Sequence, residues 1–321
     1  MLDLPDVRKL RVLREVASRG TIAAAADALG MTASAASQQL AALEKQAGVE
    51  LVVRTGRSVT LTPTALRLVE HTERVIEHLE AARVDLSTDP GDISGELHLA
   101  SFATAIGAIV APALPVLRER YPMLDIGVIE RDPENALPAL ATGTIDLALV
   151  ADYDLLPSIA PVGASLELLL EEPMRLVLPE RLDPKGRPVA LESLASQRWI
   201  AASTGTSCNL FVHRACHQAG FDPQIWSLSG DYGVIKRLVA AGAGVALIPS
   251  IALHDVPPEV VVADLEQRAV RRIHIATRAG SHNHPGVRAI VEELRSVAKT
   301  VALELALAAP SAPPPRIRTR D

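Results

Sequence analysis

Two loops rich in hydroxyl side chains are candidate sites for binding a small polar molecule or an anion. Each follows an apolar, strand-like run and precedes a helix-like segment. At the start of a helix, free backbone N–H groups and hydroxyl donors together suit a carboxylate or another anion. Plain capping of the two helices is the simpler alternative for either loop alone. The side chains concerned are Ser101, Phe102 and Thr104 in the first loop, and Ser203, Thr204 and Thr206 in the second.

The positions of these loops predict a shared cleft. In open α/β sheets, ligands bind beyond the carboxyl ends of the strands, near helix N-termini. The presence of two such strand ends on two similar half-domains favours a cleft between the lobes. The segment 229–233, with Asp231, is a third candidate for the lining of this cleft, after the two hydroxyl-rich loops.

Signals for catalysis or metal binding are weak. The sequence contains no G-x-S-x-G elbow, P-loop or H-E-x-x-H motif. The glycine pair in residues 240–249 lacks the third glycine of a dinucleotide fingerprint. His213 and His217 lie four residues apart beside Cys216, but no third metal ligand accompanies them. We therefore expect no enzyme, no cofactor and no metal site.

The first sixty residues have features of a different kind. Apolar spacing predicts helices over 7–19, 22–29 and 34–47, with a turn at 30–32 between the last two. Two short helices joined by a turn containing glycine form the helix-turn-helix pattern. Polar groups on the outward face of the second could contact base edges or phosphates, although a solvated face is the simpler alternative. The candidate DNA contacts here are Thr21, Thr32, Ala33, Ser34, Ser37 and Gln38.

The segment that follows predicts a β-hairpin. Residues 50–62 read as two short strands around a turn containing Gly56, and a hairpin directly after a helix-turn-helix is a wing. Arg54 and Arg57 at its two ends could touch phosphates or the minor groove, or could be ordinary surface arginines. Residues 1–62 carry eight Lys and Arg against six Asp and Glu, whereas the whole chain has a net charge of −6. A basic segment joined to an acidic body favours contact with a polyanion.

A long helix is predicted over 63–87. Its apolar positions alternate in spacings of three and four, which is the heptad seam of a helix that packs on another helix. We expect dimerisation through this seam, with packing on the chain's own body as the alternative. A dimer would suit paired DNA half-sites. The seam consists of Ala65, Leu68, Thr72, Val75, Leu79, Ala82 and Leu86, of which Leu68, Val75, Leu79 and Leu86 are the proposed dimer contacts.

The remaining two thirds of the chain alternates between strand-like and helix-like runs. A Pro/Gly/Asp-rich hinge at 88–94 separates it from the long helix. Such alternation predicts parallel α/β sheets, two of them in a segment of this length. Residues 307–321 hold several prolines and arginines and are expected to be disordered.

Composition excludes several other classes. Of 321 residues, 48% are hydrophobic and 22% charged, typical of a globular protein, and only eight are aromatic, too few for a single-strand stacking platform. The uncharged run 99–117 is interrupted by glycine and prolines, so we expect no membrane span. With only two cysteines and no secretory signal, a cytoplasmic protein, nucleoid-associated when bound to DNA, is expected.

Taken together, these residues resemble the LysR-type transcriptional regulators. The likeness is close in AAAADALGMTASAASQQLAALEKQAGVEL (23–51) and in the wing, and it continues in YP (121–122), TGTIDLAL (142–149) and LVAAGAGVALIP (238–249). It covers roughly residues 5–305.

The resemblance implies a winged helix-turn-helix followed by an effector part of two α/β subdomains similar to type 2 periplasmic binding proteins. Its implied divisions are 1–62 for the DNA-binding domain, 63–87 for the linker helix, 95–166 with 269–306 for subdomain I, and 167–268 for subdomain II. It implies binding to double-stranded promoter DNA as a homodimer or homotetramer, and control by a small anionic or polar effector bound between the subdomains.

By resemblance, positions 32, 34, 37, 38 and 54 face DNA, while Ser101, Thr104 and the 203–206 loop match the effector cleft. The family often has Gln and Pro where this chain has Ala33 and Ser34, and Arg where it has Gln38, so the preferred DNA sequence does not carry over. Three alternatives stay open: a solute-binding protein, a helix-turn-helix fused to an enzyme, and a regulator whose cleft binds nothing.

Overall fold

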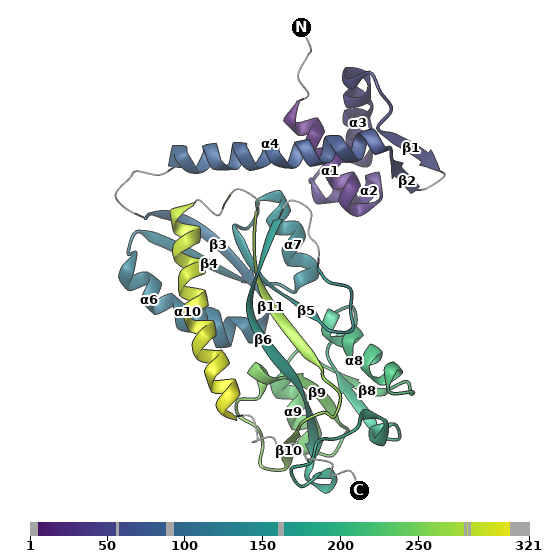
Figure 1. Cartoon of the computed structure of the whole chain (residues 1–321), viewed down its shortest axis with the longest axis vertical. Coiled ribbons are helices and arrows are strands. Elements are labelled where there is room, and N and C mark those ends of the chain that lie inside the picture. Colours follow the sequence, from purple (N-terminus) through teal and green to yellow (C-terminus); the bar gives the residue numbers. More distant parts are fainter. Residues whose placement is uncertain are drawn as a thin grey trace, which may run out of the picture.

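A computed structural model describes residues 6–55, 58–87, 93–159, 164–278, 281 and 284–308. A small head of helices and a hairpin lies at one end, and a larger two-lobed body lies below it, with the long helix α4 (Pro63–Ser87) between them (Figure 1). Two expected segments fall largely outside the described residues: the hinge at 88–94, of which only 93 and 94 are described, and the tail at 307–321, of which 307 and 308 are described and are helical rather than disordered.

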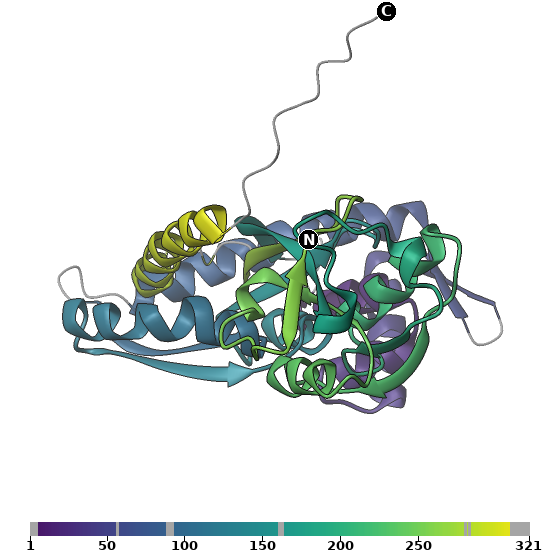
Figure 2. The ribbon, with the colours of Figure 1, turned by 90° about the horizontal axis from the view of Figure 1, so that it is seen from below.

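The head has the expected three helices and wing: α1 (Val7–Arg19), α2 (Ile22–Ala28), α3 (Ala33–Ala47), β1 (Val52–Thr55) and β2 (Ser58–Leu61). Leu10, Leu13, Leu40 and Leu43 form its core. The two wing strands pair antiparallel and project away from the rest of the chain in both views (Figures 1 and 2). The Glu44 carboxylate accepts the N–H groups of residues 51 and 52, which fixes the wing against α3.

The first lobe of the body surrounds one large apolar core. Leu99, Ile109, Leu147 and Ile273 are among its fully buried members. The elements of this lobe are β3 (Gly95–Ser101), α5 (Ala103–Ala105), the π-helix η1 (Ile106–Val110), α6 (Ala111–Arg120), β4 (Leu124–Glu130), α7 (Pro133–Thr142), β5 (Leu147–Tyr153), β11 (Val270–Arg278) and α10 (Pro285–Ala308).

The second lobe has its own core, in which Trp199 and Phe211 are fully buried. The long strand β6 (Ala164–Pro179) leads into it from the first lobe. The other elements are η2 (Glu180–Leu182), η3 (Leu191–Leu194), β7 (Arg198–Ala201), α8 (Ser207–Gln218), β8 (Gln224–Leu228), α9 (Tyr232–Ala240), β9 (Ala246–Pro249), η4 (Ser250–Ala252) and β10 (Val260–Ala263).

The main sheet of the body is mixed, which corrects the expectation of purely parallel ones, whereas β7 and β8 pair in a separate parallel sheet. In the described part of the chain, seven strands join in the order β10-β6-β11-β5-β3-β4, with β9 also on β6. Strands β3, β4 and β5 are parallel, whereas β11 runs antiparallel to both β5 and β6. The reason is the chain's path: it leaves the first lobe along β6 and returns along β11, so the two crossing strands run in opposite directions.

The crossing point lies within β6 and β11. Leu170 still packs in the core of the first lobe, whereas Met174 packs in that of the second. On the return, Ala269 belongs to the second lobe and Ile273 to the first. We place the crossing at 171–173 and 270–272, a few residues beyond the 166/167 and 268/269 divisions that the resemblance implies.

The glycine pair that resembles half a dinucleotide fingerprint has a structural explanation. Gly242 follows the end of α9 and has a φ of 75°. A Cβ on Gly244 would lie 2.5 Å from the Arg198 carbonyl oxygen, because β7 passes close to that backbone. Both positions therefore favour glycine for reasons of packing and backbone conformation.

Candidate functional site

The outward face of α3 is exposed as expected. Ala33, Ser34 and Gln38 are solvent-exposed, and Ser37 is partly buried. The two threonines serve as helix caps: the Thr21 hydroxyl accepts the N–H of residue 24 at 3.2 Å, and the Thr32 hydroxyl accepts that of residue 35 at 3.2 Å. They therefore set where α2 and α3 begin.

The wing residues are only partly described. Arg54 lies on β1 opposite Val59, so its backbone is fixed by the hairpin, while the structure does not describe its side chain. Arg57 lies outside the described residues.

The seam of α4 divides into two parts. Ala65 is buried in the head core and Leu68 packs partly against it, so the first part follows the alternative of packing on the chain's own body. Val75 and Leu79 are 40% and 51% exposed. The side chain of Leu86 is not among those described. An apolar surface therefore remains on the second half of the helix.

A cavity of about 150 Å³ lies between the two lobes, at the expected cleft. Four predicted residues line it: Phe102, Thr104, Ser203 and Thr206. Three others are near it but do not line it. Ser101 is fully buried at the end of β3, Thr204 is exposed, and Asp231 caps α9 by accepting the N–H of Gly233 at 2.6 Å.

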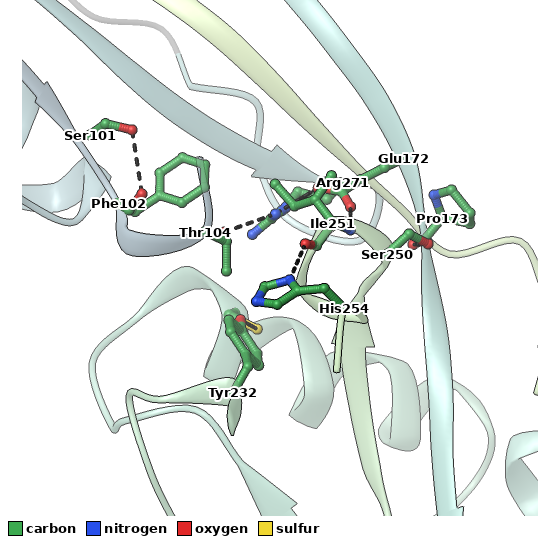
Figure 3. A network of polar contacts seen from close by, with 11 residues as sticks. Ser101, Phe102, Thr104, Glu172, Pro173, Tyr232, Ser250, Ile251, His254 and Arg271 are labelled. Atoms are coloured by element: carbon green, nitrogen blue, oxygen red, sulfur yellow. Dashed lines mark hydrogen bonds and ion pairs between the residues drawn. The ribbon is translucent and has the colours of Figure 1, made fainter. Parts of the chain in front are cut away.

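The floor of this cavity holds a buried ion pair that the sequence did not indicate. Arg271 on β11 and Glu172 on β6 are register partners, and their Nη2 and Oε1 atoms lie 2.6 Å apart. Arg271 also donates to the Thr104 hydroxyl at 3.2 Å and lies over the Phe102 ring, as Figure 3 shows. Burial alone would lower the pKa of Arg271, but the Glu172 carboxylate outweighs it and the pKa is raised. The pair ties together the two strands that join the lobes.

A group of neutral hydrogen-bonding side chains forms another part of the lining. The Tyr232 hydroxyl donates to the Cys208 Sγ at 3.1 Å, and Tyr153 stacks on Phe211 with ring centroids 5.2 Å apart. Burial raises the pKa of both tyrosines and of the Cys208 thiol. Cys208 is therefore a protonated thiol at neutral pH, which suits packing and hydrogen bonding better than nucleophilic attack.

The N-terminus of α8 already holds a carboxylate from the opposite lobe. Glu134 on α7 accepts the backbone N–H of Ser207 at 2.9 Å and also the Ser207 hydroxyl. The start of α8, to which the loop at 203–206 leads, therefore binds a carboxylate of the chain itself. We call this contact the Glu134 latch.

Asp132 lies next to the latch on the cavity wall. It occupies the N-cap position of α7, but its side chain makes no capping hydrogen bond. Partial burial and the nearby Glu134 charge raise its pKa. The wall from β4 to α7 is therefore rich in negative charge, with Glu130, Asp132 and Glu134 all lining the cavity.

Possible metal ligands lie apart from one another in the fold. Within the described residues, no three His, Cys, Asp or Glu side chains gather closely enough to hold a metal ion. His217 instead lies 3.5 Å from Asp222. None of the helices described is both long enough and apolar enough to cross a bilayer.

Comparison with protein-family models gives two matches. Residues 7–66 match the bacterial regulatory helix-turn-helix protein of the lysR family, and residues 90–299 match the LysR substrate binding domain. The second match alone covers about two thirds of the chain.

Individual relatives and solved structures are also similar to this chain over most of its length. The probable transcriptional regulator LrrA of Synechococcus elongatus is 27% identical, over 92% of this chain and 98% of its own. A probable hydrogen peroxide-inducible genes activator of Mycobacterium avium is 31% identical, over 78% and 79%. A solved structure of a Corynebacterium glutamicum OxyR mutant with H2O2 bound has a TM-score of 0.58 at 24% identity, covering 96% and 97%. The chain described here belongs to the LysR family of bacterial transcriptional regulators.

Proposed function

We propose that this regulator binds double-stranded promoter DNA through α3 and the wing, as a homodimer or homotetramer held together by the exposed half of α4. Positions 33, 34, 37 and 38 lie on or near the exposed face of α3, which fits a major groove. We place the protein in the cytoplasm, on the nucleoid when bound, and we assign it regulation by binding rather than catalysis, as in its relatives.

The cleft between the lobes is the proposed effector site. Its floor offers the Thr104 hydroxyl and one edge of Arg271, and its opposite wall offers Ser203 and Thr206 at the start of α8. A cavity of about 150 Å³ admits only a small molecule. We propose a polar effector whose anionic group replaces Glu134 at the N-terminus of α8, because that terminus already binds a carboxylate.

One observation carries the mechanism: the two ends of α7 touch different parts of the molecule. Near its first turn, Glu134 makes the latch with Ser207. Near its last turn, the Ala141 carbonyl accepts a hydrogen bond from Arg14 of the head at 3.3 Å. Both contacts lie on the same helix, with Pro138 between them, and we propose that release of Glu134 by an effector shifts the surface on which α1 rests.

Arg14 suits this role because it is held rigidly. It is 5% exposed, and its Nη2 lies 2.8 Å from the Glu15 carboxylate, which also binds Arg19 at 3.0 Å. An effector that prefers one position of α7 would therefore bias the orientation of the head, and DNA would in turn change affinity for the effector by the same factor.

The test uses Glu134→Gln in the full-length protein, which keeps the side-chain shape but removes the charge. We expect its affinity for promoter DNA to change about fivefold or more without any effector, within the range of allosteric coupling energies. Ser207→Ala should shift the affinity in the same direction. Glu119→Gln on the exposed part of α6 is the matched control and should have no effect. Unchanged DNA binding in both latch variants would refute the proposed relay.

A further inference from the structure

The charges that line the cleft between the lobes are unbalanced. Three carboxylates line the cavity, whereas Arg271 is the one cation among its described lining residues. The carboxylates belong to Glu130 at the end of β4 and to Asp132 and Glu134 at the start of α7. Arg271 is already neutralised, because its Nη2 lies 2.6 Å from the Glu172 Oε1, and Figure 3 shows this pair. The cavity therefore carries an excess of negative charge before any ligand enters it.

Two of these carboxylates have no partner of opposite charge. Within the described residues, neither Glu130 nor Asp132 forms an ion pair or a side-chain hydrogen bond. Arg131 lies between them in the sequence but does not line the cavity. Partial burial and the Glu134 charge raise the pKa of Asp132, so the folded chain holds its ionised form at a cost in stability. A charged group kept in an unfavourable state within a ligand cleft is a candidate for ligand binding.

The anion position at α8 and the acidic wall lie side by side. In the proposed function, an anionic group of the effector takes the place of the Glu134 carboxylate, which accepts the Ser207 N–H at 2.9 Å. The displaced Glu134 then adds another unpaired carboxylate near Asp132. An effector that is only an anion would bring one more negative charge to this wall, and repulsion would oppose its binding. A cationic group on the same effector would offset that repulsion and give the carboxylates charge-assisted hydrogen bonds.

The position of Glu134 limits how far apart the two charges of the effector can be. Its carboxylate occupies the anion position, and it lies near enough to Asp132 to raise the pKa of that residue. The cation must therefore bind close to the anion, as in an α-amino acid, where one carbon carries both the ammonium and the carboxylate group. The remaining lining includes Phe102, Ala151 and Ala202, and a cavity of about 150 Å³ leaves room for a short aliphatic side chain.

We infer that the effector of the cleft is a small aliphatic α-amino acid, with its carboxylate at the N-terminus of α8 and its ammonium group at Glu130 and Asp132. This inference rests on the proposed function, since it takes the cleft as the effector site and adds the chemical class of the effector. It assigns Glu130 and Asp132 as the residues that select a zwitterion over an anion of the same shape.

The experiment is calorimetric titration of the full-length protein with L-valine, 3-methylbutanoate and 2-methylpropan-1-amine. The three probes share one branched body, but L-valine alone carries both charges. We expect one L-valine per chain, and binding about tenfold or more weaker for each of the other two, because each lacks one charge-assisted contact.

Two variants separate specificity from structure. Asp132→Asn and Glu130→Gln keep the side-chain shape and remove one negative charge. Each should weaken the binding of L-valine about tenfold or more, and each should strengthen the binding of 3-methylbutanoate, because the same carboxylate attracts the ammonium group and repels the anion. Asp125→Asn, exposed on β4 and outside the cavity, is the matched control and should leave both affinities unchanged.

Absence of saturable L-valine binding would overturn the inference, and so would parallel changes in the affinity for L-valine and 3-methylbutanoate in the two variants. Equally tight binding of 3-methylbutanoate and L-valine to the parent would also overturn it, because the ammonium group would then have no part in binding. That result would leave the proposed function intact, since the anion position at α8 would still be occupied. The DNA affinities of the two latch variants test the proposed function separately.

Discussion

At the scale of single residues, the cleft holds its charges in two contrasting ways. Arg271 and Glu172 neutralise each other in the buried floor, whereas Asp132 and Glu134 bring like charges together at the wall. Removing one partner of a buried pair leaves an uncompensated charge, but removing one of two like charges relieves repulsion. We therefore expect loss of one member of the buried pair to lower the stability of the folded protein, and loss of the Asp132 charge to raise it.

Arg271→Met should lower the free energy of unfolding by about 3–5 kcal/mol, because Glu172 would remain buried without its cation. The double variant Arg271→Met/Glu172→Gln should regain most of that loss. Urea denaturation of both variants and the parent at neutral pH measures the difference. A single variant as stable as the parent would show that Glu172 does not depend on Arg271.

Asp132→Asn should raise the melting temperature at pH 7. Burial and Glu134 raise the pKa of Asp132 in the folded protein above its ordinary value of 3.8, so its ionised form is less favourable in the folded than in the unfolded chain. The folded state is therefore destabilised above both pKa values, and the gain from Asn should shrink as the pH falls toward 3.8. Thermal melts over this pH range test the sign, and a lower melting temperature at pH 7 would contradict it.

At the scale of elements, the head and the lobes place their functional groups by simple local devices. Capping threonines start α2 and α3, Glu44 fixes the wing, and α4 leaves Val75 and Leu79 uncovered. These are features that a DNA-binding dimer needs, and each can be tested by one substitution with a matched control.

Arg54→Ala should weaken binding to DNA of any sequence and reduce the slope of log affinity against log salt by about 0.9, the value for one lost phosphate contact. Arg118→Ala on exposed α6, in the body of the protein, is the control and should keep the parent slope. Fluorescence anisotropy over a series of salt concentrations gives both values. If the slopes of Arg54→Ala and the parent agree, the wing arginine does not contact phosphate.

Leu79→Lys should shift the protein toward smaller species in sedimentation velocity, because a charge would enter the apolar half of the α4 seam. Glu70→Lys, also exposed on α4 but outside that seam, changes the charge even more and should leave assembly intact. Identical sedimentation profiles for Leu79→Lys and the parent would refute pairing through this helix.

The sequence predicted the elements whose patterns are local, and it missed those that depend on distant partners. Helical spacing and capping residues were sufficient for the three helices of the head and for α4. The pairing of β6 with β11 depends on contacts that no local pattern shows. In the fold, Glu167 pairs with Arg295 and Glu172 with Arg271, partners that lie far away along the chain.

The same limit applies to the cleft. Hydroxyl-rich loops indicated Thr104, Ser203 and Thr206, because strand ends and helix starts can be recognised locally. Arg271 and Glu134 could not be assigned, since only the crossing of β6 and β11 and the approach of α7 to α8 bring them to the cavity. A signal was present in the charged pairs within otherwise apolar strands, at 171–172 and 271–272.

At the scale of the whole molecule, the helix-turn-helix head and the body with its cavity touch through α7. The contact between Arg14 and Ala141 joins the head to the helix that also carries the latch. Affinity for DNA and occupation of the cleft are therefore expected to be linked properties of one structure.

The most direct test of this account is the affinity of the full-length protein for the duplex upstream of its own gene, measured across a salt series beside a scrambled duplex. We predict that the logarithm of affinity falls linearly with the logarithm of salt concentration, with a preference of about 10³ or more for the native duplex. Equal affinity for both duplexes, or no binding even at low salt, would contradict the account.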